Sequence, residues 1–428
     1  MAAIYDRIRV MFPDHLGLAR GKYLPIEHAE RGTAHCISLF ALGFDREMTP
    51  HEGSHMLSGL PDFEVSFSRD AVKPGWEPDT GVVVGDLSRQ GRPVEMSPRE
   101  VLKQQIASWR ELGYDPRVGL ELEAYLFEAD SEGGWRPIST PGAYVYGTGR
   151  AVDPTGTIDA VMATARAVGL PMESVNSEYD NGQFELTMSY GDALQACDNA
   201  FLFKVMAREV AAEHGILLSF LGKPINGRGG NGLHTNLSFA GHGSENAMVD
   251  EAAGDGLSDL TRRVISGILA HHVGTTALLA PTVNAYKRLQ PGQMCGYWAN
   301  WGHDHRGVTV RVPVDRGRRA RIEHRLTDGA TNPHLAVATV LAAARLGYEN
   351  SYDLPEAETL ACIENASTDV VVPDSLGAAL DALEADKAFV EAFSPAFVDG
   401  FLVTKRAEWD RFARHVTDWE MSEYLPFL

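Results

Sequence analysis

The sequence predicts an α+β fold, because it contains both segments with the periodicity of strands and segments with the character of helices. Apolar and polar residues alternate in 119–127 and in 183–186, which is the period of a half-buried strand. Helices are predicted over 97–112, 192–214 and 335–346. With 428 residues, 44% of them hydrophobic, the chain is long enough for two domains, which we place at 1–95 and 96–428.

The first predicted domain consists of short strands separated by turns. Strand patterns occur at Arg9–Phe12 and Gly81–Gly85, and turn residues at Gly91–Pro93 end this part of the chain. We therefore expect a small, strand-rich domain before the first long helix.

The three predicted helices are supported by their end residues or by their apolar content. Ser97 is a good N-cap, and Pro98 then occupies the first helical position, where its fixed φ and missing N–H are tolerated. The segment 192–214 carries spaced apolar residues such as Phe201 and Val210, and 335–346 is rich in Ala and Leu. The last of these has the composition of a buried helix.

Composition excludes several classes of function. No run of about 18 apolar residues suggests a membrane span, and the first residues lack the apolar core of a secretory signal. Four scattered cysteines without CxxC spacing make a disulfide scaffold or a zinc site improbable. A net charge of −20 argues against nucleic acid and anionic membranes as partners. We expect a cytoplasmic enzyme.

A set of carboxylates and one histidine stands out against this background. In 119–127 the leucines and Ala124 occupy one face of the predicted strand, so Glu121 and Glu123 share the other. Glu185 is placed in the same way opposite Phe184. Three further residues sit in neighbouring short segments: Glu178, His234 and Glu323.

These residues predict a metal site for phosphoryl transfer. Oxygen donors with one imidazole suit Mg²⁺ or Mn²⁺, and five carboxylates carry more charge than one divalent ion offsets, so we expect two or more ions. Phosphoryl transfer to an anionic acceptor also requires fixed cations. No Walker loop is present, which argues against a P-loop kinase. Arginines in similar apolar surroundings could supply the cations: Arg288, Arg306, Arg311, Arg318, Arg321 and Arg325.

The chain resembles glutamine synthetases of the bacterial type over nearly its whole length. The resemblance rests on separate blocks in the family's order, among them Asp14–Gly17, 119–127, 178–186, 229–238 and 284–291, followed by Arg306–Pro313 and Arg321–Arg325. It is nearest in character to γ-glutamylamide and γ-glutamylpolyamine synthetases.

The resemblance implies an architecture and a set of ligands. A small β-grasp-like domain would precede a catalytic domain built as a half-barrel of antiparallel strands backed by helices. ATP and glutamate would be substrates, with two to three Mg²⁺ or Mn²⁺ ions in each active site. Such enzymes are rings, commonly dodecamers of two stacked hexamers, in which the neighbouring subunit's first domain closes the site.

The resemblance also implies a role for each matching residue. Glu123, Glu178 and Glu185 would bind one metal, and Glu121, His234 and Glu323 would bind the second. The other roles follow from the same blocks. The α-carboxylate of glutamate would be held by Arg288 and Arg325 with Gly230 close by, the transferring phosphoryl group by Arg306, and the nucleotide by Arg311, Arg318 and Arg321.

Departures from the family pattern bear on the acceptor. In ammonia-using members a glutamate follows the Pro-Gly of the flap, whereas this chain has Met294 there. Asp45 is the one match to the family's acidic loop in the first domain, and Tyr144 matches the tyrosine near the ammonium pocket. A thioether adds apolar surface where a carboxylate would favour a hydrated cation. Trp298 follows closely and could line a pocket for an alkyl group.

We therefore favour a γ-glutamyl amide ligase that acts on a small primary amine such as methylamine, ethanolamine or a short alkylamine. One alternative is glutamine synthetase proper, using ammonia. A second alternative, of a different class, is a non-catalytic member that keeps only the fold and the assembly; the retained ligand set and arginines speak against it.

Overall fold

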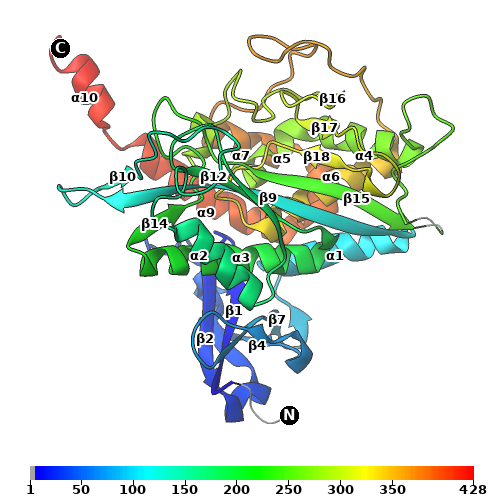
Figure 1. Ribbon diagram of the computed structural model, residues 1–428. Coiled ribbons are helices and arrows are strands. Elements are labelled where there is room, and N and C mark those ends of the chain that lie inside the picture. The colour runs from blue at the N-terminus through cyan, green and yellow to red at the C-terminus, as the bar shows by residue number, and fades with distance from the viewer. Residues whose placement is uncertain (1–4, 242, 244) are drawn as a thin grey trace.

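Two small sheets form the N-terminal part of the chain in this computed structural model, which describes residues 5–241, 243 and 245–428 (Figure 1). One sheet has the order β2-β1-β6-β5, with β1 parallel to β6, and the other has the order β3-β4-β7-β8. The two share a core of apolar side chains that includes Val10, Phe12 and Phe63. The strands are β1 (Arg7–Pro13), β2 (Ala19–Pro25), β3 (Thr33–Cys36), β4 (Asp62–Ser66), β5 (Lys73–Pro74), β6 (Thr80–Val84), β7 (Asp86–Arg89) and β8 (Arg92–Pro93).

A ten-stranded sheet dominates the rest of the chain. Its long central strand is β9 (Tyr114–Ala129), and the main order is β11-β12-β9-β15-β18-β17-β16, antiparallel except for the β16–β17 pair. Three short strands pair with other parts of β9. The remaining strands are β10 (Trp135–Pro137), β11 (Met172–Ser177), β12 (Gln183–Met188), β13 (Gly191–Asp192), β14 (Ile216–Ser219), β15 (Leu233–Gly241), β16 (Trp301–His303), β17 (Val310–Val312) and β18 (Ile322–His324).

Helices cover one face of this sheet and leave the other for polar side chains. Leu120, Leu122 and Leu126 of β9 are each 1% exposed and belong to the main core, which also contains side chains of the long helices. Figure 1 shows α1 and α3 below β9 and β15. The helices are α1 (Pro98–Glu111), α2 (Thr157–Ala167), α3 (Ala193–Glu213), α4 (Asp259–Ala270), α5 (His272–Leu279), α6 (Pro333–Asn350), α7 (Leu376–Ala385), α8 (Lys387–Phe393), α9 (Pro395–Ala413) and α10 (Asp418–Tyr424).

The predicted α+β class and the three predicted helices are confirmed. Ser97 caps α1 by accepting a hydrogen bond from the Glu100 N–H, and Asp192 caps α3 in the same manner. The helix predicted over 335–346 is longer at both ends, as α6. It begins earlier because the Asn332 side chain accepts from the His334 N–H at 2.8 Å, and Pro333 fits the first turn.

Buried polar contacts fasten the small domain to the large one. Arg99 of α1 forms two hydrogen bonds with Asp198 of α3, at 2.7 and 2.8 Å, and it also contacts Asp86 of β7. The Asn332 side chain, which caps α6, donates to the Asp14 carbonyl at 3.2 Å. These contacts set the first domain against the helical side of the large sheet, as Figure 1 shows.

The lengths and the composition of the described helices were compared with those of a membrane span. Among the residues that the structure covers, none forms a helix with the length and apolar character needed to cross a bilayer.

Candidate active site

Strand register brings four of the predicted metal ligands onto one patch of the large sheet. On β9, Glu121 lies directly opposite His234 of β15, and Glu123 lies directly opposite Glu185 of β12. Directly paired residues of antiparallel strands project to the same side, with Cβ atoms about 5 Å apart. The alternation seen in the sequence therefore places these side chains together on the face opposite the leucines of β9.

Two groups of ligand atoms are close enough to hold cations. One consists of Glu121, His234 and Glu323, and the other of Glu123, Glu185 and His234; within each group the ligand atoms lie within 4.8 Å of one another. His234 Nδ1 lies 3.2 Å from Glu121 Oε2 and 3.6 Å from Glu323 Oε1, and its Nε2 lies 3.7 Å from Glu123 Oε1. The imidazole thus stands between the two groups.

The first group is the trio that sequence analysis assigned to one metal. In the second group the structure places His234 beside Glu123 and Glu185, where the sequence assignment had Glu178. Glu178 nevertheless lies close enough to Glu123 to feel its charge, which together with burial raises the pKa of Glu178. It follows β11 at the edge of this cluster.

The carboxylates of the cluster differ in how far nearby positive charge compensates them. Burial, reinforced by Glu121, raises the pKa of Glu185 to about 7. Burial also acts on Glu323, but the nearby Arg325, His234 and Arg311 outweigh it and lower its pKa to about 2. Crowded, partly desolvated carboxylates whose pKa values move apart are typical of a site that takes up cations.

This donor set fits Mg²⁺ or Mn²⁺. Carboxylate oxygens converge from three strands, one imidazole is available, and buried charge of one sign requires compensation. Neither group contains a cysteine, which favours hard cations over zinc.

Three arginines border the carboxylates. Arg311 of β17 donates to Glu323 Oε2 at 2.6 Å and to Asp304 Oδ1 at 2.6 Å, and Arg325 contacts the other oxygen of Glu323. Arg288 is 4% exposed and donates to the carbonyls of Leu326 at 2.8 Å and Arg325 at 3.3 Å. Because carbonyl oxygens carry only partial charge, the Arg288 guanidinium keeps its capacity for an anionic ligand.

Glycines allow the backbone to approach these groups. A Cβ on Gly232 would lie 2.7 Å from Arg288 Nη2 and 2.8 Å from His234 Nε2, and a Cβ on Gly230 would lie 2.8 Å from Arg288 Cγ. The Gly232 N–H also donates to Glu123 Oε2 at 2.6 Å. The space beside Arg288 is therefore kept open by the missing side chains.

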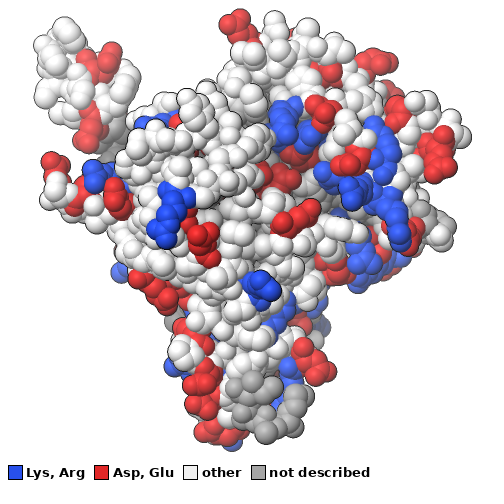
Figure 2. All heavy atoms as spheres, viewed as in Figure 1, with Lys and Arg blue, Asp and Glu red and all other residues white. Residues whose placement is uncertain are grey.

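Arg321 reaches the site through an asparagine. Its Nε donates to Asn236 Oδ1 at 2.9 Å, and Asn236 Nδ2 donates to Glu121 Oε1 at 2.8 Å. The other two arginines assigned to phosphates, Arg306 and Arg318, are exposed, and Arg318 pairs with Glu245. Figure 2 shows basic side chains interspersed with acidic ones on the upper part of the face that carries β15 to β18 in Figure 1.

Gly232 and Asn236 were not singled out as site residues by sequence analysis. Asn236 lies two positions after His234 on β15, so the alternation of the strand puts its side chain on the same side as the imidazole, whereas Gly232 directly precedes the strand. That period was a usable signal for Asn236. The role of Gly232 depends on Arg288, which is far away in the sequence.

The structure separates other predicted residues from this cluster. Trp298 is 6% exposed and packs with Val308 and Cys362 in a small apolar cluster, and its place in the acceptor pocket stays a prediction. Asp45 lies in the first domain, where its carboxylate contacts Arg411 of α9 in the same chain. Tyr144 and Met294 are exposed, at 82% and 58%.

The loop of Met294 is nevertheless tied to the site. Its carbonyl accepts a hydrogen bond from Arg325 Nη2 at 3.3 Å, and its backbone adopts a left-handed conformation with φ of 50°. The Met294 side chain therefore projects from a segment anchored to an arginine of the cluster.

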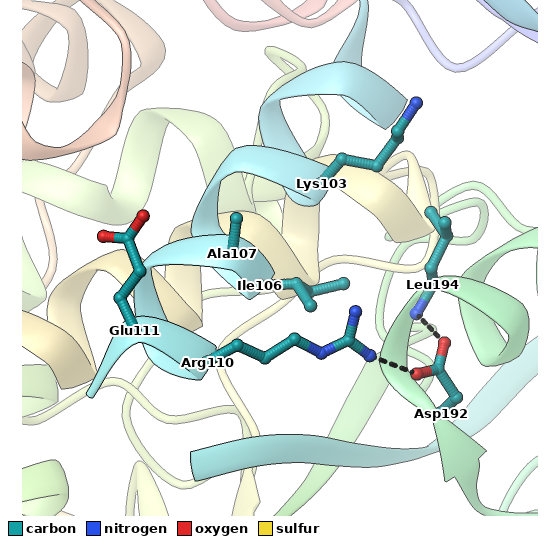
Figure 3. A pocket seen from close by; sticks show the side chains of 7 residues that line it. All are labelled: Lys103, Ile106, Ala107, Arg110, Glu111, Asp192 and Leu194. Carbon is teal, nitrogen blue, oxygen red and sulfur yellow. Dashed lines mark hydrogen bonds and ion pairs between the residues drawn. The ribbon is translucent and has the colours of Figure 1, made fainter. Parts of the chain in front are cut away.

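A surface hollow lies away from these residues. A cavity of about 630 Å³ is bordered by α1 and the start of α3, with Ile106, Ala107 and Leu194 among its lining (Figure 3). Arg110 at its edge is paired with Asp115 at 2.8 Å and with Asp192 at 2.9 Å. Its positive charge is thus already compensated, and we assign this cavity no part in the chemistry.

Comparison with known proteins identifies the family. The model of the glutamine synthetase catalytic domain matches residues 95–424. The chain belongs to the glutamine synthetase family. This confirms the resemblance noted in the sequence and makes the chain a ligase that forms C–N bonds.

Full-length relatives include two kinds of enzyme. Gamma-glutamylethanolamide synthetase GlnA4 of Streptomyces coelicolor is 35% identical over 97% of this chain and 92% of that protein. Glutamine synthetase of Pyrococcus abyssi is 32% identical over 98% of this chain and 96% of that protein. The structure of GmaS without ligand superimposes with a TM-score of 0.85, at 29% identity, and covers 99% of this chain and 97% of that one.

Proposed function

We propose that this protein is an ATP-dependent glutamate–amine ligase that forms a γ-glutamyl amide from a small primary amine through γ-glutamyl phosphate. The observation that carries the proposal is the juxtaposition of two cation-binding groups with the Arg288 guanidinium, whose hydrogen bonds go to carbonyls. A metal-bound nucleotide and an amino acid carboxylate could then meet on one face of the sheet.

Two or three Mg²⁺ or Mn²⁺ ions would be held by the carboxylates and His234. We assign Glu121, His234 and Glu323 to one ion and Glu123, Glu178 and Glu185 to another, with His234 near both. When bound, such ions supply positive charge to phosphate oxygens, which lowers the cost of the charge that develops during transfer.

Glutamate would be bound through its α-carboxylate. Arg288 and Arg325 present planar guanidinium groups from adjacent segments, and Gly230 and Gly232 leave room beside Arg288 for the amino acid backbone. Each guanidinium group can donate two parallel hydrogen bonds to a carboxylate, and this fixes the direction in which the side chain of the bound glutamate points. The γ-carboxylate would then point toward the carboxylate cluster.

In the first step, a γ-carboxylate oxygen of glutamate attacks the γ-phosphorus of ATP, a new O–P bond forms, and the bond to the β-phosphate oxygen breaks to release ADP. We assign Arg306 to the transferring phosphoryl group and Arg311, Arg318 and Arg321 to the nucleotide phosphates. Arginines placed on developing charge are the main protein contribution to reactions of this class.

In the second step, the amine nitrogen attacks the acyl carbon of γ-glutamyl phosphate, the C–O bond to phosphate breaks, and the nitrogen loses a proton. We assign Glu178, which directly follows β11 at the edge of the carboxylate cluster, to accept that proton. Water must be excluded at this stage, because the acyl phosphate would otherwise hydrolyse.

An organic amine is favoured over ammonia as acceptor for two reasons. Met294 places a thioether on a loop anchored to Arg325. At this position, ammonia-using members of the glutamine synthetase family carry a glutamate. The relative GlnA4 adds support, because it is a gamma-glutamylethanolamide synthetase. A monoamine fits better than a polyamine, because the carboxylate of Asp180 already faces a cation, with Arg228 Nη1 3.6 Å from its Oδ1.

Glutamine synthetase proper is the second candidate. Enzymes of that name from Pyrococcus and Clostridium match this chain at 31–34% identity, which is close to the value for GlnA4. In this case Asp45 of a neighbouring subunit and Glu178 would bind the ammonium ion.

We also propose a homo-oligomer, a dodecamer of two hexameric rings, with active sites shared between subunits. The C-terminal arm, residues 416–428, supports association. It includes α10 and stands away from the body of the molecule (Figure 1), while Trp419, Phe427 and Leu428 are 62%, 84% and 99% exposed. Apolar side chains this exposed are typical of segments that pack on another subunit.

The test is ATP-dependent phosphate release with glutamate and Mg²⁺, comparing ammonia with methylamine, ethanolamine and propylamine at equal free-base concentration. We expect one amine to exceed ammonia in kcat/KM by at least tenfold, which is about 1.4 kcal/mol of transition-state discrimination. Preference for ammonia would make this a glutamine synthetase with an altered flap. No release with any acceptor would overturn the assignment as a whole.

A further inference from the structure

A loop beside Glu178 is held rigidly by one buried serine. Ser177 is 3% exposed, and its hydroxyl donates to the Tyr144 carbonyl at 2.6 Å and accepts from the Gly147 N–H at 2.9 Å. The Tyr146 N–H donates to the Ser177 carbonyl at 2.9 Å. Residues 144–147 are thus fastened to the end of β11, one position before Glu178.

The backbone of this loop adopts a conformation that most residues avoid. Tyr146 has φ of 61°, in the left-handed region that costs a residue with a side chain on the order of 1 kcal/mol or more. A Cβ on the next residue, Gly147, would lie 2.8 Å from the Tyr144 carbonyl oxygen and 2.7 Å from Val152 Cγ1. Strain maintained by hydrogen bonds and a glycine is common where a side chain has to be aimed.

Three tyrosine side chains are exposed around this fixed point. Tyr144 and Tyr146 are 82% and 64% exposed, and Tyr179, which directly follows Glu178, is 82% exposed. The Tyr179 N–H donates to Glu178 Oε2 at 3.2 Å, so this backbone is tied to the carboxylate itself. In Figure 1 part of the chain between β10 and α2 stands above β12, beside the end of the sheet that carries these residues.

We propose that Tyr146 and Tyr179 form an aromatic rim over Glu178 that binds the organic group of the acceptor amine and so sets the preference for an amine over ammonia. This inference rests on the proposed ligase function and names the residues that select its acceptor.

The chemistry of tyrosine suits this task. An aromatic face packs against methylene groups, and a phenolic hydroxyl at its edge can bond to a hydroxyl such as that of ethanolamine. The face of the aromatic ring also attracts a positively charged nitrogen. Ammonia has no carbon to bury, so loss of the ring surface should change the use of alkylamines far more than the use of ammonia. A flexible loop would lose this benefit to ordering entropy, which the bonds to Ser177 avoid.

The experiment measures kcat/KM for the best amine and for ammonia in Tyr146→Ala, Tyr179→Ala and the double variant. We expect a tenfold or greater loss with the amine for the double variant, and a change of less than threefold with ammonia. Tyr146→Phe and Tyr179→Phe keep the ring and should retain most of the activity with alkylamines. Trp135→Ala, which removes an exposed aromatic from β10 in the same domain, is the matched control and should alter neither acceptor.

The outcomes separate this inference from the proposed function. Equal losses with amine and ammonia, or no loss with either, would overturn the aromatic rim while leaving the ligase activity intact. A change in particle mass of the double variant, measured by analytical ultracentrifugation, would assign the tyrosines to a subunit contact and would also overturn it. If the wild-type protein accepts neither acceptor, it is the proposed function that fails.

Discussion

A single methyl group beside Arg288 provides a sharp test of the site. In Gly232→Ala the new Cβ would lie 2.7 Å from Arg288 Nη2 and 2.8 Å from His234 Nε2, about 0.7 Å inside an ordinary contact distance of 3.4 Å. Gly232 has no left-handed φ, so alanine itself is not strained there, and the effect comes from the collision alone. Arg288 cannot retreat easily, because it is buried and bonded to two carbonyls.

The magnitude follows from the displacement. Moving a binding or reacting group by about 1 Å costs on the order of 100-fold in rate, or about 2.7 kcal/mol. We expect kcat/KM for glutamate to fall by roughly that factor, and Mn²⁺ affinity to fall because His234 is displaced as well. Overpacking of this kind destabilises the fold by about 1–3 kcal/mol.

The assay combines steady-state kinetics at varied glutamate, Mn²⁺ titration by calorimetry and thermal unfolding. Gly191→Ala is the matched control, because a Cβ there has no atom within 4 Å. If Gly232→Ala keeps kcat/KM within threefold of the wild type and binds Mn²⁺ equally well, the close approach of backbone, Arg288 and His234 does not serve the reaction.

Three further predictions concern stability. Burial and the nearby Lys405 lower the pKa of His15 to about 3, so the unfolded chain binds a proton that the folded chain does not between pH 6.5 and 3. The contribution of His15 to stability should therefore fall as pH drops below 6.5, by about 2 kcal/mol at pH 5. Denaturant titrations of His15→Leu should show a pH dependence that is smaller by this amount, while His272 and His324 maintain a slope of the same sign. The Glu358 carboxylate accepts from Ser367 N and Oγ, Leu360 N and Asn300 Nδ2 at 2.8–3.0 Å, so Glu358→Gln should destabilise by about 1–3 kcal/mol and loosen residues 358–367 in hydrogen exchange. Trp298→Ala should cost about 3 kcal/mol of unfolding free energy, because Trp298 packs with Val308 and Cys362. The ratio of amine to ammonia activity should stay unchanged, and a selective loss with amines would instead support the predicted place of Trp298 in the acceptor pocket.

Local sequence patterns were sufficient for two of the strands that carry the site, β9 and β12. The alternation around Glu121 and Glu123 correctly placed both on the face opposite the leucines, because successive side chains of a strand point to opposite sides. Ser97 and Pro98 likewise marked the start of α1, since capping and a fixed φ act within one turn. Among the three predicted helices, the largest error lies at the ends of α6, because its apolar content was read without its cap at Asn332.

Aromatic side chains near the flap could not be assigned from their position in the chain. Trp298 is four residues from Met294, yet the first is buried in a satellite cluster and the second is exposed. The bridge between Trp298 and Val371 decides this difference, and it joins segments that no local pattern connects. The contact between Asp45 and Arg411 joins residues even further apart in the chain.

The sequence by itself determined which chemical groups this protein has and which of them share a strand face, because alternation and helix capping depend on covalent geometry over a few residues. Tertiary structure decided which of those groups meet. The register of β9 with β12 and β15 sets His234 between two pairs of carboxylates, where sequence analysis had placed Glu178 in one of the groups. Register depends on how the leucine face packs against the helices, and that packing is a property of the whole core.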